Sequence, residues 1–318
     1  MMVTILMATF NGAKYISEQL DSILAQTYTD WELIIRDDLS TDHTLSIIKK
    51  YVDADSRIKL LPSTGPHGSA VQNFSMLFDY GVTLSTPYIM FADQDDVWRT
   101  NKVESSIAYI QRQESRTTSS HPILIYGALQ YVDTKGHIIP QKLNMPAALN
   151  VRMLLTENHA YGCTMILNRA LVQQIGHIPV TAENHDYWVA LVACTLGNAV
   201  LNPEILISYR QHANNVSGNV HRNRLSSRMH RYIKKVDFLL PVFVKNFNMI
   251  NAYYNIYRAA LDTETRALIG EYITAYKSDV RSLMSFMVKN NIRKFGRLQT
   301  LAHYYTIVQL RRKVLEQL

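Results

Sequence analysis

The chain has 318 residues, of which 47% are hydrophobic and 10% aromatic, with 33 Lys and Arg against 26 Asp and Glu. This composition excludes a disordered or a fibrous chain, and the length fits one large core plus an appendage. Cys163 and Cys194 are too few for a disulfide framework or a multi-cysteine metal site, so we interpret both as small buried thiols in a reducing compartment.

Charge is divided unevenly along the chain. Residues 1–218 hold 15 Lys and Arg and 20 Asp and Glu, whereas residues 219–318 hold 18 and 6. This asymmetry indicates a polyanionic partner for the C-terminal part, either nucleic acid or an anionic membrane surface. We therefore expect two domains, one that carries the chemistry over residues 1–220 and a basic, mainly helical one over residues 221–318.

Targeting signals are weak throughout the sequence. The first ten residues lack the basic region and cleavage site of a signal peptide, and no apolar run reaches the roughly 18 residues that a spanning helix needs. We therefore expect a cytoplasmic protein.

Strand and helix patterns alternate from the first residues. Apolar runs predict strands at 3–10, 32–35, 58–62 and 88–92, with helices near 16–24, from Asp42 and at 70–83. Strands that are apolar on both faces belong in a parallel sheet covered by helices, so we expect an α/β fold. Later patterns predict strands at 124–133, 163–167 and 199–202, helices at 170–175 and 187–196, and a helical region from about 224 with Pro241 as its interior breaker.

Acidic residues follow two of the predicted strands. Arg36-Asp37-Asp38 ends the second strand, and the ligand crevice of such a sheet lies off the carboxyl ends of its strands, so one carboxylate there can bind a base or a ribose. The alternative is that Asp38 and Asp42 only cap the next helix. Asp93-Gln94-Asp95-Asp96 follows the fourth strand, and its clustered negative charges favour a bound Mg²⁺ or Mn²⁺ over a solvated acidic turn.

These motifs carry a family resemblance. TILMATFNGAKYISEQLDSILAQTYTDWELIIRDDLSTDHT, with FADQDDVW some fifty residues on, resembles the N-terminal domain of a family 2 glycosyltransferase of the GT-A fold, in particular the bacterial rhamnosyltransferase-like group that builds surface polysaccharides. The likeness spans roughly residues 3–220. It implies a Rossmann-like domain that binds a nucleotide-diphosphate sugar, with a helical C-terminal extension.

The resemblance also implies roles for residues of the nucleotide and metal sites. Thr9 and Asn11 would lie in the loop around the nucleotide, Asp38 would hold the base or ribose, and Gly68 and Asn73 would line the donor site. The DxD motif falls on Asp93 and Asp95, with Asp95 the direct metal ligand and Asp93 facing the ribose or the water shell of the metal. The sequence departs from the family at Leu39, where a small residue, commonly Gly, is usual, which puts the local loop geometry in question.

Two further segments match the family downstream. In Glu183-Asn184-His185-Asp186, the resemblance makes Asp186 the base that takes the proton of the attacking hydroxyl, although a His-Asp pair before an apolar helix is also a common N-cap. His185 would tune Asp186 or simply pack. In YRQHANNVS, the resemblance brings His212 to the metal and Arg210 to the diphosphate, and the alternative is a surface loop histidine.

The basic block from His221 to Lys235 runs into the apolar segment 238–244. Basic residues beside a short apolar run suit an interfacial helix on anionic lipid, which would bring the enzyme to a polyprenol-linked acceptor. A helical subdomain with a solvated arginine-rich face is an equal alternative. We expect no nucleic acid as partner because no recognition motif accompanies the charge. Homo-oligomerisation through the C-terminal region stays open.

Sequence and resemblance together predict an inverting, metal-dependent transferase that moves rhamnose or another hexose from a dTDP- or UDP-sugar to a hydroxyl of a lipid-linked or growing glycan. A dehydrogenase is excluded because its glycine-rich phosphate turn is missing after the first strand, where only Gly12 occurs. The alternative is a catalytically inactive scaffold at the membrane that binds glycan or nucleotide sugar.

Overall fold

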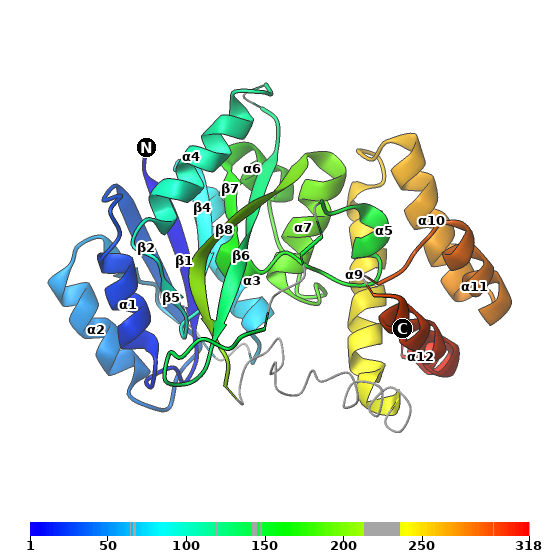
Figure 1. Ribbon diagram of the computed structural model, residues 1–318, viewed down its shortest axis with the longest axis horizontal. Coiled ribbons are helices and arrows are strands. Elements are labelled where there is room, and N and C mark those ends of the chain that lie inside the picture. The colour runs from blue at the N-terminus through cyan, green and yellow to red at the C-terminus, as the bar shows by residue number, and fades with distance from the viewer. Residues whose placement is uncertain are drawn as a thin grey trace.

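The computed structural model describes residues 1–63, 65, 68–118, 120–141, 145–146, 148–212, 236–294 and 296–317. Within these ranges, a single eight-stranded sheet of order β3-β2-β1-β4-β7-β6-β8-β5 forms the centre of the molecule (Figure 1). Its strands are β1 (Val3–Thr9), β2 (Trp31–Asp37), β3 (Ile58–Leu60), β4 (Tyr88–Ala92), β5 (Val97–Trp98), β6 (Ile123–Val132), β7 (Ile166–Asn168) and β8 (Asn198–Arg210).

The first four strands are parallel, as their continuous apolar runs predict. β1 pairs in parallel with β2 and β4, and β2 pairs in parallel with β3. Beyond them the sheet is mixed, because β7 runs antiparallel to both β4 and β6, while β8 is parallel to β6. The register sets Thr9 opposite Asp37, so the carboxyl ends of β1 and β2 stop at the same level.

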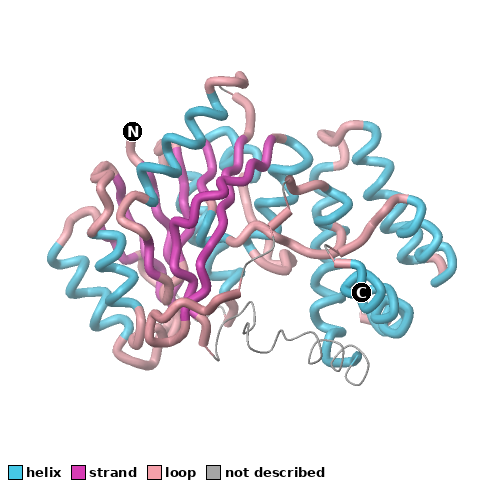
Figure 2. Tube along the Cα trace, viewed as in Figure 1, coloured by secondary structure: helices cyan, strands magenta, loops and turns pink. Residues whose placement is uncertain are grey.

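Helices cover both faces of the sheet (Figures 1 and 2). One hydrophobic cluster joins a sheet face to α1 (Ile16–Leu24), α2 (Thr44–Ala54) and α4 (Lys102–Glu114). A second cluster joins the opposite face to α3 (Ala70–Thr83), α5 (Val151–Leu154), α6 (Arg169–Ile175) and α7 (His185–Leu196). This two-sided cover buries strands such as β4 along their whole length.

The C-terminal helices pack on the second of these clusters. They are α9 (Leu240–Tyr257), α10 (Thr263–Lys277), α11 (Val280–Lys289) and α12 (Arg297–Leu315), preceded by the short 3₁₀ helix η3 (Val236–Leu239). Phe247 and Tyr253 of α9 belong to the same cluster as Leu6 of β1 and Trp188 of α7. The helical region therefore continues the core of the sheet domain. Among the helices described, none combines the length and the apolarity required to cross a bilayer.

Two sequence expectations need correction, and two others fall outside the described residues. Residues 163–167 do not form one strand, because Gly162–Thr164 is a 3₁₀ turn and β7 begins at Ile166. Pro241 does not break a helix but stands in the first turn of α9, where its missing N–H costs no hydrogen bond. The domain boundary at 220 and the basic block from His221 to Lys235 lie outside the described residues.

Leu39 shows why a small residue is usual at its position. Its φ of 60° lies in the left-handed region, and its side chain is 41% exposed in the loop after β2. A side chain with a Cβ is strained in this conformation, whereas glycine adopts it freely.

We expect Leu39→Gly to raise the free energy of unfolding by about 0.5 kcal/mol, because relief of roughly 1 kcal/mol of strain exceeds the added entropy of the unfolded chain. Urea denaturation measures the change. Leu39→Ala is the control, since it removes the exposed side chain but keeps the strain. A Gly variant less stable than the Ala variant would contradict this account.

Candidate active site

The loops after β1 and β2 are held together by the side chain of Asp37. This buried carboxylate accepts hydrogen bonds from Thr9 Oγ1 at 2.7 Å, from the Ser40 amide at 2.7 Å and from Ser40 Oγ at 2.6 Å. Asn11, with φ of 48°, accepts a hydrogen bond from the Thr41 amide at 2.8 Å. Asp37 therefore has a structural role, and the hydroxyl of Thr9 is engaged with it.

The next carboxylate, Asp38, faces the loop before α3. It accepts a hydrogen bond from the Gly68 amide at 3.0 Å and lies 3.4 Å from Arg36 Nη1. Arg36 Nη1 also donates to Asn73 Oδ1 at 2.7 Å, and Asn73 Nδ2 donates to the carbonyl oxygen of Thr9 at 3.2 Å. The structure thus brings together four of the predicted donor-site residues, namely Thr9, Asp38, Gly68 and Asn73.

Asp42 is not the N-cap of α2, because that position is His43, which makes no side-chain cap hydrogen bond. α2 begins at Thr44, and the carboxylate of Asp42 accepts a hydrogen bond from the Thr44 amide at 2.9 Å. Among the described residues, the carboxylate of Asp38 contacts Gly68 and Arg36.

The acidic loop between β4 and β5 is fixed against the loop after β1 by Gln94. Its Oε1 accepts a hydrogen bond from the Phe10 amide at 2.9 Å, and its Nε2 donates to the Phe10 carbonyl at 3.0 Å. A Cβ on Gly12 would lie 2.2 Å from Gln94 Oε1. A Cβ at Gly12 would therefore displace the Gln94 side chain from its hydrogen bonds with Phe10.

The end of β8 closes the acidic loop from the other side. His212 Nε2 lies 2.6 Å from Asp95 Oδ2, and its ring stacks on Tyr15 with centroids 5.2 Å apart. The Arg210 amide donates to Asp96 Oδ1 at 3.0 Å, and Arg210 Nε donates to the Asp95 carbonyl at 2.9 Å. The predicted pair of Asp95 and His212 is thus in direct contact.

The guanidinium of Arg210 is 1% exposed. Besides the Asp95 carbonyl, it bonds to the Thr134 carbonyl at 3.3 Å and forms an ion pair with Glu18 of α1. These contacts bind the acidic loop, β8 and α1 into one unit. The ion pair with Glu18 is a contact that the sequence analysis did not anticipate.

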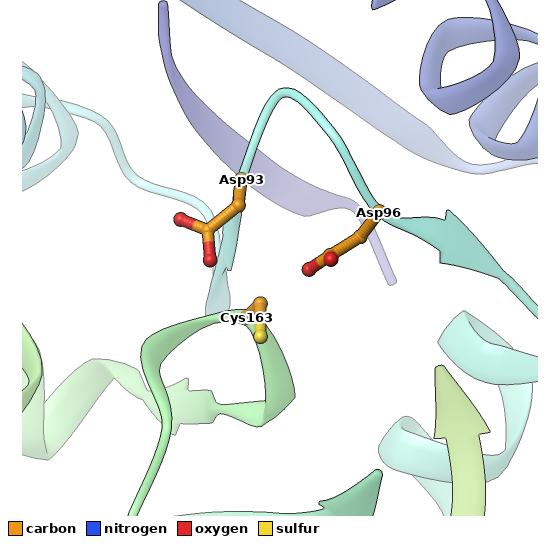
Figure 3. Close-up of side chains that lie close together, drawn as sticks. All are labelled: Asp93, Asp96 and Cys163. Carbon is orange, nitrogen blue, oxygen red and sulfur yellow. The ribbon is translucent and has the colours of Figure 1, made fainter. Parts of the chain in front are cut away.

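Asp93 is grouped with Asp96 and with the buried thiol of Cys163 (Figure 3), and their ligand atoms all lie within 4.8 Å of one another. Burial raises the pKa of Asp93, and the charges of Asp95 and Asp186 raise it further. Burial and the charges of Asp95 and Asp93 raise the pKa of Asp96, whose Oδ2 is buried without a hydrogen-bond partner among the described residues.

The donor set of this loop fits a divalent cation. Three carboxylates and an imidazole offer oxygen and nitrogen ligands of the kind that Mn²⁺ accepts. The raised pKa values of Asp93 and Asp96 indicate that their negative charges are not fully neutralised by nearby cations. Buried Lys102 contributes a positive charge near Asp96 and Cys163, and burial lowers the pKa of this lysine to about 8.

Asp186 lies in the first turn of α7, and its charge acts on Asp93. It accepts a hydrogen bond from the Gly162 amide at 3.1 Å and another from the side chain of Asn158. Burial raises its pKa to about 6, against the lowering effect of these hydrogen bonds. The N-cap of α7 is Asn184, so Asp186 is not the cap of this helix.

His185 packs rather than tuning its neighbour. Its ring stacks on Phe74 with centroids 3.8 Å apart and meets Phe91 edge-on. Burial lowers the pKa of His185 to about 3, so the imidazole is neutral at physiological pH.

Three contacts at this edge of the sheet were missed by the sequence analysis. They involve the side chains of Glu18, Lys102 and Cys163. Glu18 and Cys163 are separated by many residues from the side chains they meet, and no local pattern marks any of the three. The buried state of Cys163 was anticipated, but its neighbours were not.

Comparison with solved structures shows that this chain has the GT-A fold. TarS residues 1–349 of S. aureus, solved in complex with UDP, matches with a TM-score of 0.57 and 16% identity over 98% of this chain and 92% of that one. The Pyrobaculum calidifontis mannosyltransferase PcManGT, solved with GDP-Man and Mn²⁺, matches with a TM-score of 0.55 and 13% identity over 98% and 84%.

Sequence comparison then identifies the family. The profile of glycosyl transferase family 2 matches residues 4–176, and the chain belongs to this family. It is 30% identical to the dTDP-rhamnosyl transferase RfbG of Shigella flexneri over 67% of this chain and 73% of that protein. It is 29% identical to the E. coli UDP-Glc:alpha-D-GlcNAc-diphosphoundecaprenol beta-1,3-glucosyltransferase WfgD over 69% and 80%. The protein is therefore a glycosyltransferase, with relatives that act in glycan biosynthesis.

We expect stabilisation by Mn²⁺ to grow with pH. The pKa values of Asp93 and Asp96 are raised in the folded state, so protonation favours the folded metal-free protein, and this contribution is lost as pH rises through the folded pKa values. Protons and the cation compete for the same oxygens. The increase in melting temperature on adding MnCl₂ should therefore be larger near pH 8 than near pH 6.

Asp93→Asn tests this dependence, and Asp79→Asn, at an exposed carboxylate paired with His177, is the matched control. The first variant should lose most of the Mn²⁺ shift, and the second should keep it. An equal shift at both pH values in the unaltered protein would contradict the assignment.

Proposed function

We propose that this protein transfers rhamnose or another hexose from a dTDP- or UDP-sugar to a hydroxyl of a lipid-linked or growing surface glycan, with inversion at the anomeric carbon. The observation that carries the proposal is the hydrogen bond from the Gly162 amide to Asp186 of α7, because the next residue, Cys163, is grouped with Asp93 of the acidic loop. The charge of Asp186 also raises the pKa of Asp93. A candidate base and the candidate metal loop therefore share one site.

The donor would bind across the ends of β1, β2 and β4. Asp38, with one oxygen on the Gly68 amide, has the acceptor capacity that a pyrimidine imide or a ribose hydroxyl requires. Asp93, Asp95 and His212 would hold Mn²⁺ or Mg²⁺, which when bound neutralises the charge of the leaving diphosphate. The names of RfbG and WfgD support a dTDP- or UDP-linked donor.

The acceptor would enter from the side of α7. Its hydroxyl gives its proton to a carboxylate oxygen of Asp186 as the oxygen attacks the anomeric carbon from the face opposite the diphosphate. A pKa of about 6 suits this role, because the carboxylate is mostly ionised at neutral pH yet is basic enough to accept a proton. Arg210 is ion-paired with Glu18, so any contact with the diphosphate requires the guanidinium to exchange partners.

Asp186→Asn should lower the transfer rate by roughly 10²–10⁴-fold, the usual contribution of a general base. Binding of the donor, measured as a Mn²⁺-dependent thermal shift with dTDP- and UDP-sugars, should persist. Asp95→Ala should lose both transfer and that shift. Asp53→Asn, at an exposed carboxylate of α2, is the control.

Normal turnover in Asp186→Asn would refute the assigned base. Donor binding without transfer to any acceptor in the unaltered protein would favour a scaffold that binds nucleotide sugar. Retention of anomeric configuration in the product, read by NMR, would contradict an inverting mechanism.

We also propose that the protein is cytoplasmic and binds the inner face of the membrane peripherally. Phe238 and Val242, at 71% and 47% exposed, lie at the start of the C-terminal helices beside exposed Lys245. An apolar tip next to basic residues suits anionic lipid. WfgD is named for an acceptor on diphosphoundecaprenol, a lipid, which supports the same location.

We expect the double variant Phe238→Ser and Val242→Ser to reduce sedimentation with anionic vesicles by about tenfold, since two apolar side chains no longer insert. Neutral vesicles and the variant Ile256→Ser, at another exposed residue of α9, are the controls. Equal binding of both variants would contradict membrane contact at this tip. Size-exclusion chromatography tests the alternative that the tip joins copies of the chain.

A further inference from the structure

Helix α9 holds the residues on both sides of the candidate base. Asn246 Nδ2 lies 3.3 Å from Glu183 Oε2 and 3.2 Å from the hydroxyl of Tyr187. The Glu183 amide also donates to Met249 Sδ at 3.4 Å. Because Glu183 and Tyr187 flank Asp186 in the sequence, one asparagine of the helical region fixes the segment that carries the base.

A second bridge reaches Asp186 from the segment between α11 and α12. Lys294 Nζ pairs with Glu157 Oε2 at 3.1 Å, and both side chains are largely buried. The next residue, Asn158, hydrogen-bonds Asp186 through its side chain. The helical region therefore supports the acceptor side of the site by two separate routes.

Glu183 differs from the other carboxylates at this junction. Glu157 pairs with Lys294, and Glu264 pairs with Arg152 at 2.9 Å. Glu183 is half-buried and accepts a hydrogen bond from Asn246, and the charges of Lys294 and Lys245 act on it without forming an ion pair among the described residues. Its Oε1 has no hydrogen-bond partner among those residues, so this oxygen is left with acceptor capacity.

Glu183 also shares the electrostatic environment of the base. Burial raises the pKa of Glu183, against the lowering effects of the hydrogen bond from Asn246 and the charges of Lys294 and Lys245, and the charge of Asp186 adds to the rise. Glu183 directly precedes the N-cap of α7 and Asp186 lies in the first turn of that helix. A sugar whose hydroxyl reaches Asp186 presents other hydroxyls nearby, and each must find an acceptor or stay in water.

We propose that the helical region completes the acceptor site of this enzyme. Oε1 of Glu183 accepts a hydrogen bond from a second hydroxyl of the acceptor sugar while Asp186 receives the proton of the attacking hydroxyl. Asn246 is a positioning residue that holds Glu183 through its other oxygen. This inference rests on the proposed transfer to a glycan hydroxyl and names the residue that selects among acceptors.

The test is a kinetic comparison of Glu183→Gln with Glu264→Gln, which alters a carboxylate at the same junction but outside the proposed contact. Glu183→Gln should raise the KM for the acceptor about tenfold, because a charge-assisted hydrogen bond becomes a neutral one. The KM for the donor and the metal-dependent hydrolysis of donor without acceptor should change less than about twofold. Glu264→Gln should leave all three unchanged.

Acceptors that lack single hydroxyls locate the contact. One deoxy acceptor should lose about tenfold in kcat/KM with the unaltered enzyme and much less with Glu183→Gln, because both changes remove the same hydrogen bond. Asn246→Ala should raise the acceptor KM without moving the donor KM. Thermal unfolding of each variant separates this effect from a loss of folded protein.

Additive losses for every deoxy acceptor, or equal changes in donor and acceptor KM, would overturn the inference and assign Glu183 a structural role. Absence of both transfer and donor hydrolysis in the unaltered enzyme would instead overturn the proposed function. The two failures are therefore distinguishable.

Discussion

The candidate site depends on one constraint, which is the mutual repulsion of the carboxylates that follow β4. Asp93, Asp95 and Asp96 stand within four residues, and burial and mutual charge raise the pKa values of Asp93 and Asp96. The fold holds them there with neutral contacts from Gln94 and with Arg210, whose amide and guanidinium bind the loop. The acidic loop stays in place despite this repulsion because the loop after β1 and the end of β8 anchor it.

Much of the catalytic half of the fold could be predicted from the sequence, because its strands are buried on both faces and read as continuous apolar runs. The predicted strand at 88–92 and the helix at 70–83 match β4 and α3. Prediction failed where local patterns are weak. Residues 163–167 have strand composition, but Gly162 makes a close approach to His185 and the chain turns there before β7 begins.

The residues of the candidate site also fall into those that the sequence predicts and those that it does not. Asp38, Asp95 and Asp186 are recognisable because each stands at a strand or helix end with a characteristic neighbour. Contacts of the kind made by Glu18 with Arg210, or by Asn246 with Glu183, join positions more than sixty residues apart and depend on tertiary packing. A residue within a family motif can be predicted from the sequence, whereas the distant residues that hold it in place are found only in the structure.

The shared hydrophobic cluster limits how this architecture can diverge. Since Phe247 and Tyr253 of α9 pack in the same core as Trp188 of the helix that carries Asp186, the C-terminal helices are not an interchangeable module. A chimera that joins this catalytic half to the helices of a relative would have to carry over the facing surfaces of α5 and α7 as well. New acceptor preferences in such enzymes would therefore arise by coordinated substitution on both sides of the interface between the C-terminal helices and the sheet domain, rather than by exchange of whole domains.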